Sequence, residues 1–343
     1  MTSTFSSLFG YTPNILGTPK PPKTPPKALP ASWYRSPGMQ CKNTFVQVSW
    51  VVVWHEWKIG KSPRFDNVPE FKKEEQSLFP VHVHVDDLGF IWVNLDSSKT
   101  PIPWHEDFKG VDTQERFQNF DFSQYKFDHI WHMNGNYNWK TLADNYNECY
   151  HCTVAHPDVA NLADLSYYYT VSTPGHIQHF SRPKEDKLDE DIQNASTYYF
   201  PNACMTVSPH FFYLMRCVPT SAGTCSMEYE VYRHKHASDK DFEYIDAFFK
   251  RVLDEDKHLC NAAQKNLNAG VFVNGQLHPE LESAPLFFQN TVRRLLGAHR
   301  EEEKRQRKEI WPAQQHSAGS ATAEDIEFCS GLACSEGSSS LDW

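Results

Sequence analysis

The sequence predicts an α+β fold in which helices lie to one side of an antiparallel sheet. Three segments have helical periodicity: residues 139–154, 239–267 and 286–309. Six others have the alternation or the β-branched and aromatic content of strands: residues 127–131, 166–171, 177–180, 197–200, 211–218 and 225–233. Because few strands alternate with helices, an antiparallel sheet with segregated helices is favoured over a parallel one.

Composition sets broad limits on the kind of protein. The chain has 343 residues, of which 40% are hydrophobic and 14% aromatic, enough for one large domain and a smaller one. The net charge of −10 argues against nucleic acids and anionic membranes as partners. No apolar run has membrane-spanning length. Nine cysteines without a framework spacing favour a reducing compartment, so a cytoplasmic location is expected.

The two ends of the chain have compositions typical of disorder. Residues 1–30 are rich in Ser, Thr, Pro and Lys and predict an extended arm. No acidic residue precedes Glu56, a feature shared with organelle transit peptides, so targeting by this arm stays open. A plain arm is preferred because the first arginine is Arg35 and no basic amphipathic helix is visible. Residues 312–343 predict a disordered tail.

A strand pair is expected after the arm. Val81, Val83 and Val85 alternate with two histidines, which is the period of a half-buried strand. Residues 86–89 contain a glycine and predict the turn, and residues 90–95 predict the partner strand. Prolines and polar residues up to residue 112 predict a linker to the main domain.

The densest group of candidate metal ligands lies in residues 138–157. Glu148 precedes His151 by three residues, so the two side chains would share one face of a helix. His156 lies five residues beyond His151 and would point elsewhere in an unbroken helix. Pro157 disfavours helical geometry at His156, so the helix should end just before it. Both imidazoles can then converge on one ion.

A third ligand is expected from a distant helix. Oxygen-activating Fe(II) sites use two histidines and one carboxylate on one face of the metal. Asp256 is the best candidate, although its helix also fits a solvated acidic face. Cys149-x-x-Cys152 is an alternative redox or zinc pair, but no second pair occurs at zinc spacing.

These segments resemble a known family. The pattern N-W-K-x-x-x-D-N-Y-x-E-C-Y-H-x-x-x-x-H-P at residues 138–157, followed by E-D-x-x-L-C-x-x-A-Q at residues 255–264, resembles the catalytic domain of Rieske-type ring-hydroxylating oxygenase α subunits. Within that family, choline monooxygenase and its fungal relatives are the most similar. The resemblance covers roughly residues 62–295. It implies a helix-grip (START-like) catalytic domain at residues 110–311, preceded by a truncated Rieske-type β domain at residues 31–100.

The resemblance also implies roles for individual residues. His151, His156 and Asp256 would bind mononuclear non-haem Fe(II). Glu148 would be the residue through which electrons cross from a neighbouring subunit's cluster, and Asn145 a polar residue close to the iron.

The implied activity is that of a monooxygenase. The protein would oxidise choline, or a similar quaternary ammonium compound, to betaine aldehyde in glycine betaine synthesis. It would use O2 and electrons from a ferredoxin or an NAD(P)H-dependent reductase. A homo-trimer is implied, because each cluster must approach the next subunit's iron.

The chain departs from the family at the [2Fe–2S] cluster. Rieske centres need two cysteines and two histidines, which the family arranges as C-x-H and C-x-x-H. Residues 31–64 contain one cysteine, Cys41, and one histidine, His55. His55 lies in a segment that resembles a ligand turn, but Val52 stands where the cysteine should be. A cluster cannot be built from these residues. Either the module was lost or the sequence omits an exon.

Two other functions therefore stay open. One is a related oxygenase that hydroxylates a secondary metabolite or an aromatic substrate. The other is an inactive iron-binding remnant that lacks the electron relay. Three aromatic runs, at residues 167–169, 198–200 and 211–213, indicate sheet packing first. Their alternative is an aromatic cage around a quaternary ammonium, where each ring contributes roughly 0.5–2 kcal/mol.

Overall fold

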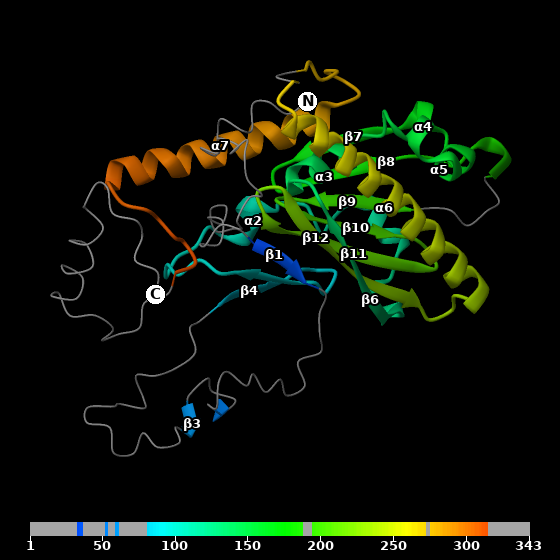
Figure 1. Cartoon of the computed structure of the whole chain (residues 1–343). Helices are drawn as coiled ribbons and strands as arrows, with labels where there is room; N and C mark the ends of the chain where they lie inside the picture. Colours follow the sequence, from blue (N-terminus) through cyan, green and yellow to red (C-terminus); the bar gives the residue numbers. More distant parts are fainter. Residues whose placement is uncertain are drawn as a thin grey trace.

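The computed structural model describes residues 81–187, 194–271 and 275–314, together with the backbone of three short strands near the N-terminus (Figure 1). Those strands are β1 (Trp33–Ser36), β2 (Val52–Val53) and β3 (Ile59–Lys61). The expected arm, most of the expected β domain with Cys41 and His55, and the tail from residue 315 lie outside the described residues.

A seven-stranded antiparallel sheet forms the centre of the molecule, as the sequence predicts. Its order is β6-β12-β11-β10-β9-β8-β7, so every neighbour except the β6–β12 pair is also a neighbour along the chain. The strands are β6 (Tyr125–Gly135), β7 (Tyr169–Thr173), β8 (His176–Phe180), β9 (Ala195–Tyr199), β10 (Ala203–Val207), β11 (Phe211–Ser221) and β12 (Thr224–His234).

The strand predictions are wrong in two places. Strand β10 was missed because most of its side chains are buried, so the polar–apolar alternation that marks a half-buried strand is absent. The strand predicted from residue 166 begins at Tyr169. Residues Leu165–Tyr167 form a 3-10 turn instead, whose N-cap Asp164 accepts a hydrogen bond from the backbone N–H of Ser166.

The helices are α2 (Trp104–Asp107), α3 (Trp139–Tyr146), α4 (Cys152–Ala155), α5 (Pro157–Leu162), α6 (Asp239–Asn268) and α7 (Ser283–Gln306). Short 3-10 helices also occur at Glu115–Asn119, Phe122–Gln124 and Glu185–Lys187. The long helix α6 runs across one face of the sheet (Figure 1). Its N-cap Ser238 accepts a hydrogen bond from the backbone N–H of Asp241. The single helix predicted over residues 139–154 is wrong, because α3 ends at Tyr146 and α4 is a separate turn.

Side chains alternate along the strands and build two cores on opposite faces of the sheet. Tyr198 and Tyr213 face α3, α6 and α7, where they pack with Leu142, Leu253 and Phe288. Their strand neighbours Tyr199, Phe212 and Leu214 belong instead to the second core. The aromatic runs at residues 198–200 and 211–213 are therefore divided between two cores, and sheet packing accounts for much of their content.

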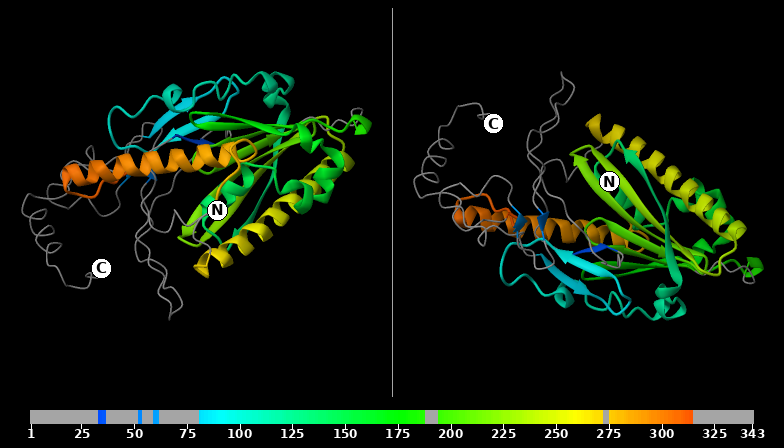
Figure 2. Two further views of the ribbon diagram at one scale, coloured as in Figure 1. Left: turned by 90° about the horizontal axis from the view of Figure 1, so that it is seen from above. Right: turned by 90° about the horizontal axis from the view of Figure 1, so that it is seen from below.

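The second core is covered by a small three-stranded sheet of order β1-β5-β4, with β4 (His82–Val85) and β5 (Ile91–Asn94). This sheet lies on the side of the large sheet opposite α6 (Figure 2). Trp92 of β5 is fully buried, and its Nε1 donates to Asp86 Oδ2 at 2.8 Å. The strand pair predicted at residues 81–95 is confirmed.

The turn between β7 and β8 depends on one glycine. Gly175 has φ +79°, and a Cβ placed on it would lie 2.1 Å from the carbonyl oxygen of Asp107. We expect Gly175→Ala to lower the free energy of unfolding by at least about 2 kcal/mol, because the clash adds to the cost of a left-handed backbone. Urea denaturation measures the change.

Gly223→Ala is the matched control. Gly223 lies in the turn between β11 and β12, and a Cβ there would meet nothing within 4 Å. Its substitution should change the free energy of unfolding by less than about 0.5 kcal/mol. Equal stability of the two variants would contradict this account of the Gly175 turn.

Candidate functional site

The chain between α3 and α5 turns sharply and brings the predicted ligands together. Helix α3 ends as the backbone N–H and the side-chain Nδ2 of Asn147 both donate to the Ala143 carbonyl. Helix α4 ends at Ala155, and His156 has non-helical angles of φ −122° and ψ 78° before Pro157 opens α5. The predicted break at His156 is confirmed, although the helix before it is not continuous.

Three ligand-type atoms meet at this turn. His156 Nε2 lies 3.0 Å from Asp256 Oδ1 and 3.2 Å from His151 Nε2, and His151 Nε2 lies 3.3 Å from Asp256 Oδ1. We call these three atoms the ligand triangle. Asp256 arrives from α6, a hundred residues further along the chain, and both Asp256 and His156 are buried. The solvated acidic face considered for Asp256 is therefore wrong.

The size of the ligand triangle suits a metal ion. Two ligands at right angles, each about 2.1 Å from an ion, lie about 3.0 Å apart. The observed edges of 3.0–3.3 Å match one face of an octahedron. Two imidazoles and a carboxylate on one face are the donor set of non-haem Fe(II) oxygenases. These residues could hold one such ion and leave its opposite positions open.

Each histidine of the triangle has a carboxylate on its other ring nitrogen. His151 Nδ1 pairs with Glu148 Oε1, and His156 Nδ1 lies 2.8 Å from Glu255 Oε2. A carboxylate accepts, so each Nδ1 carries a proton, and each Nε2 would present its lone pair to the triangle once a metal ion displaces the proton there. Sequence reasoning found Glu148 from its spacing to His151 but missed Glu255, because its partner lies on a different element.

Asn145 joins α3 to the same group. Its Nδ2 donates to Asp256 Oδ1 at 2.7 Å, which fixes the orientation of the carboxylate. The structure therefore brings together all five residues predicted from the catalytic region: Asn145, Glu148, His151, His156 and Asp256.

The side chains of the ligand triangle stabilise one another's charged forms. Burial lowers the pKa of His151, but its hydrogen bonds to Asp256 and Glu148 more than offset this and raise the pKa to about 9. Burial also lowers the pKa of His156, and contacts with Asp256 and Glu255 raise it overall. Burial raises the pKa of Asp256, but the two imidazoles lower it overall. A positive charge is stabilised here, and a bound metal ion would replace protons in supplying it.

Cys152 is a rival to Asp256 as the third ligand. Its Sγ lies within 4.8 Å of the ligand atoms of His151 and His156. However, Cys152 forms a disulfide with Cys149, and a metal-binding sulfur must be a thiolate. Asp256 Oδ1 also lies closer to both histidines. We therefore favour Asp256. Of the two alternatives for the Cys149-x-x-Cys152 pair, the structure supports redox pairing rather than a zinc site.

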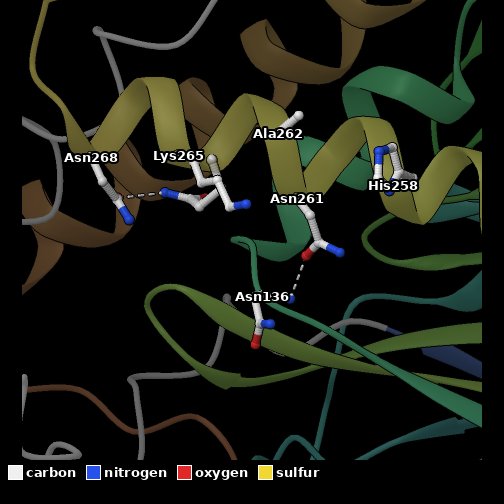
Figure 3. Close-up of a pocket in the computed structure, with 7 residues that line it drawn as sticks. Asn136, His258, Asn261, Ala262, Lys265 and Asn268 are labelled. Carbon is white, nitrogen blue, oxygen red and sulfur yellow. Dashed lines mark hydrogen bonds between the residues drawn. The ribbon is translucent and has the colours of Figure 1, made fainter.

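A surface pocket of about 350 Å³ lies further along α6 (Figure 3). It is lined by Asn136, His258, Asn261, Ala262, Gln264, Lys265 and Asn268. Asn261 Oδ1 accepts from the Asn136 backbone N–H, and Gln264 Oε1 accepts from that of Asn138. No member of the ligand triangle lines it. These two hydrogen bonds hold α6 against the segment that leads into α3. The residues that line the pocket therefore have a structural role.

Aromatic rings cover the sheet on the side that α6 faces. Trp131 and Tyr229 stack with centroids 4.0 Å apart, and Phe249 of α6 lies 5.6 Å from Tyr213. The Tyr213 hydroxyl accepts from Thr206 Oγ1 at 3.2 Å. The Tyr229 hydroxyl is buried and has no partner among the described residues. Rings of this kind can surround an apolar or cationic group.

Comparisons with known proteins point to one family. Residues 122–298, which are 177 of the 343 residues, match the family described as ring hydroxylating alpha subunit (catalytic domain). A carnitine monooxygenase oxygenase subunit from Acinetobacter baumannii is 26% identical over 232 residues, covering 63% of this chain and 62% of that protein. Putrescine 2-hydroxylase from Bordetella bronchiseptica is 24% identical over 206 residues, covering 52% and 48%. The chain thus spans less than two thirds of the length of these relatives.

Solved structures share the fold. The quaternary ammonium Rieske monooxygenase CntA in complex with L-carnitine aligns with a TM-score of 0.60 and 20% identity, over 71% of this chain and 69% of that one. Naphthalene 1,2-dioxygenase from Rhodococcus sp. aligns with a TM-score of 0.54 and 15% identity, over 72% and 74%.

Among the helices of the described ranges, none combines the length and the apolar character needed to cross a membrane. The match over more than half of the chain, together with the shared fold, shows that this protein belongs to the ring-hydroxylating oxygenase alpha-subunit family and carries its catalytic domain.

Proposed function

We propose that this chain is the oxygenase component of a non-haem iron monooxygenase that acts on a quaternary ammonium compound. The ligand triangle is the observation that carries the proposal: two imidazole Nε2 atoms and one carboxylate oxygen lie 3.0–3.3 Å apart where the turn meets α6. His151, His156 and Asp256 would hold Fe(II), which when bound supplies the binding and reduction of O2.

Two further side chains serve this site. Asn145 keeps the Asp256 carboxylate turned toward the histidines through its 2.7 Å hydrogen bond. Glu148 contacts His151 Nδ1 and also accepts from the backbone N–H groups of Tyr150 and His151. It fixes the tautomer of His151 and shapes the turn. We assign it the further role of the point where electrons enter the site. The family resemblance implies this role, and the hydrogen bond between Glu148 and a proposed iron ligand is compatible with it.

A quaternary ammonium substrate is supported by the aromatic rings on the α6 side of the sheet and by the names of the relatives. Aromatic faces attract a cation that cannot donate hydrogen bonds, and several rings lie on the α6 side of the sheet. Relatives that match this chain are named for carnitine, which carries such a group. Within this class we favour choline or a similar alcohol, whose hydroxylation gives betaine aldehyde. A secondary-metabolite or aromatic substrate is the second candidate.

The electron relay is not provided by the residues that the family would use. One cysteine and one histidine between residues 31 and 64 do not fit the two-plus-two donor set of a Rieske cluster. Electrons would have to come from a ferredoxin, a reductase or the cluster of a different chain that has the missing ligands. Without such a donor the chain would be the iron-binding remnant considered from the sequence.

Assembly and location complete the proposal. A homo-trimer is what the resemblance supports. Within the described ranges, the free cysteines Cys204, Cys217, Cys225 and Cys260 are buried thiols and fit the cytoplasm. The Cys149–Cys152 disulfide is the feature that a reducing compartment would oppose.

Removing any member of the triangle should remove the metal. His151→Ala, His156→Ala and Asp256→Ala are each expected to reduce bound iron to below about a tenth of the wild-type content, because two remaining ligands hold iron weakly. Iron is measured by mass spectrometry after anaerobic loading with Fe(II) and desalting.

Cys152→Ser is the control for the choice of the third ligand. This variant loses the rival sulfur and should keep its iron. Retained iron in Asp256→Ala, combined with lost iron in Cys152→Ser, would contradict the assignment and make Cys152 the ligand.

Substrate class can be tested with a charged and a neutral ligand of the same shape. Choline at about a hundred times its dissociation constant should stabilise the iron-loaded protein by about 2.7 kcal/mol, which raises the melting temperature by about 5 °C or more. The neutral isostere 3,3-dimethylbutanol should raise it far less, since it lacks the cation.

Equal shifts with both ligands would contradict recognition of the positive charge. No shift with choline or carnitine, together with a shift from an aromatic acid, would favour the second candidate.

A further inference from the structure

We propose that Glu255 is a positioning residue that fixes the tautomer and orientation of His156 and thereby strengthens metal binding at the ligand triangle. This inference rests on the proposed function, because it concerns the same metal site. Glu255 stands in the pattern that carries the family resemblance, but neither the spacing of the ligands nor the resemblance gave it a role.

Two successive residues of α6 contact the two ring nitrogens of His156. Glu255 Oε2 lies 2.8 Å from His156 Nδ1, and Asp256 Oδ1 lies 3.0 Å from His156 Nε2. The ring has only these two nitrogens, so both are assigned. His156 is 3% exposed, and the side chain of Glu255 is 32% exposed. The carboxylate thus reaches inward from the edge of the site to a buried ring.

The contact determines which nitrogen is free to bind a metal. A carboxylate on Nδ1 requires that this nitrogen carries the proton, so the lone pair stays on Nε2, inside the triangle. Without Glu255 the ring can adopt the other tautomer or rotate by half a turn. Either change removes the Nε2 lone pair from the triangle.

The orientation of the His156 ring depends on contacts with other elements. It lies between two short helices, α4 and α5, and its own backbone is not helical. Local secondary structure therefore does not hold the ring in place. Glu255 joins it to α6, the same long helix that supplies Asp256, so two ligands of the triangle are fixed relative to one rigid element.

Glu255 differs from its neighbours in a way that makes it testable. Its carboxylate has one partner among the described residues, His156, whereas Glu148 also binds backbone N–H groups of its turn. Removal of Glu148 would thus disturb the backbone as well. Asp254, one residue before Glu255, is exposed, and its partner in the described part of the chain is Lys257 at 3.1 Å. It offers a control on the same helix.

The experiment compares Glu255→Met with Glu255→Gln, two side chains of similar size of which only glutamine keeps an acceptor oxygen. The dissociation constant for Co(II), a spectroscopic substitute for Fe(II), is measured by chelator competition in the whole chain. Glu255→Met should weaken binding 10–100-fold and alter the visible absorption of the cobalt site. Glu255→Gln should recover most of the affinity, and Asp254→Ala should bind as the wild type does.

The melting temperature of each metal-free variant separates positioning from stability. A positioning role leaves it within about 2 °C of the wild type, since the Glu255 side chain is partly exposed. Unchanged Co(II) affinity in Glu255→Met, or equal loss in the Met and Gln variants, would overturn the inference. Should Glu255→Met not fold, Glu255→Ala replaces it with the same expectation. A wild-type chain that binds no Co(II) would instead contradict the proposed function.

Discussion

The rest of the structure depends on the contact between the Asp256 carboxylate and two imidazoles. A buried carboxylate is costly unless it is paired, and His151 and His156 supply that pairing here. The contact connects α6 to a turn a hundred residues earlier, and Asn145 adds α3 to the same carboxylate. Asp256 can face inward from α6 because the turn brings His151 and His156 to its carboxylate. The contact that builds the candidate site therefore also holds α6 against the turn and against α3.

The sheet gives this contact its surroundings. Alternation along β9 and β11 sends one set of rings to the core under α6 and the other to the core beneath the small sheet. Burial raises the pKa of Tyr213 and Tyr229, so both phenols remain neutral in the core under α6. Neutral aromatic faces of this kind suit the positively charged substrate proposed above.

Part of the site could be predicted from local sequence, because Glu148, His151 and His156 lie close together in the chain, whereas Asp256 rested on the resemblance and on the expected donor set. Pro157 alone predicts that the helix stops before His156, and the structure confirms it. The early end of α3 at Tyr146 was not predictable, since Asn147 ends the helix by hydrogen bonds that periodicity does not reveal. Strand β10 lacked alternation because its side chains are mostly buried. Glu255 stands in the resemblance pattern without an assigned role, and only the position of His156 in space shows its partner.

The central claim is that this chain carries a mononuclear iron site without its own iron–sulfur cluster. The most direct measurement is the iron and acid-labile sulfide content of the protein purified without oxygen. The account predicts about one iron and no sulfide per chain. Iron and sulfide in a ratio near three to two would show a cluster held by ligands other than those considered, and a protein free of iron after anaerobic loading would contradict the site itself.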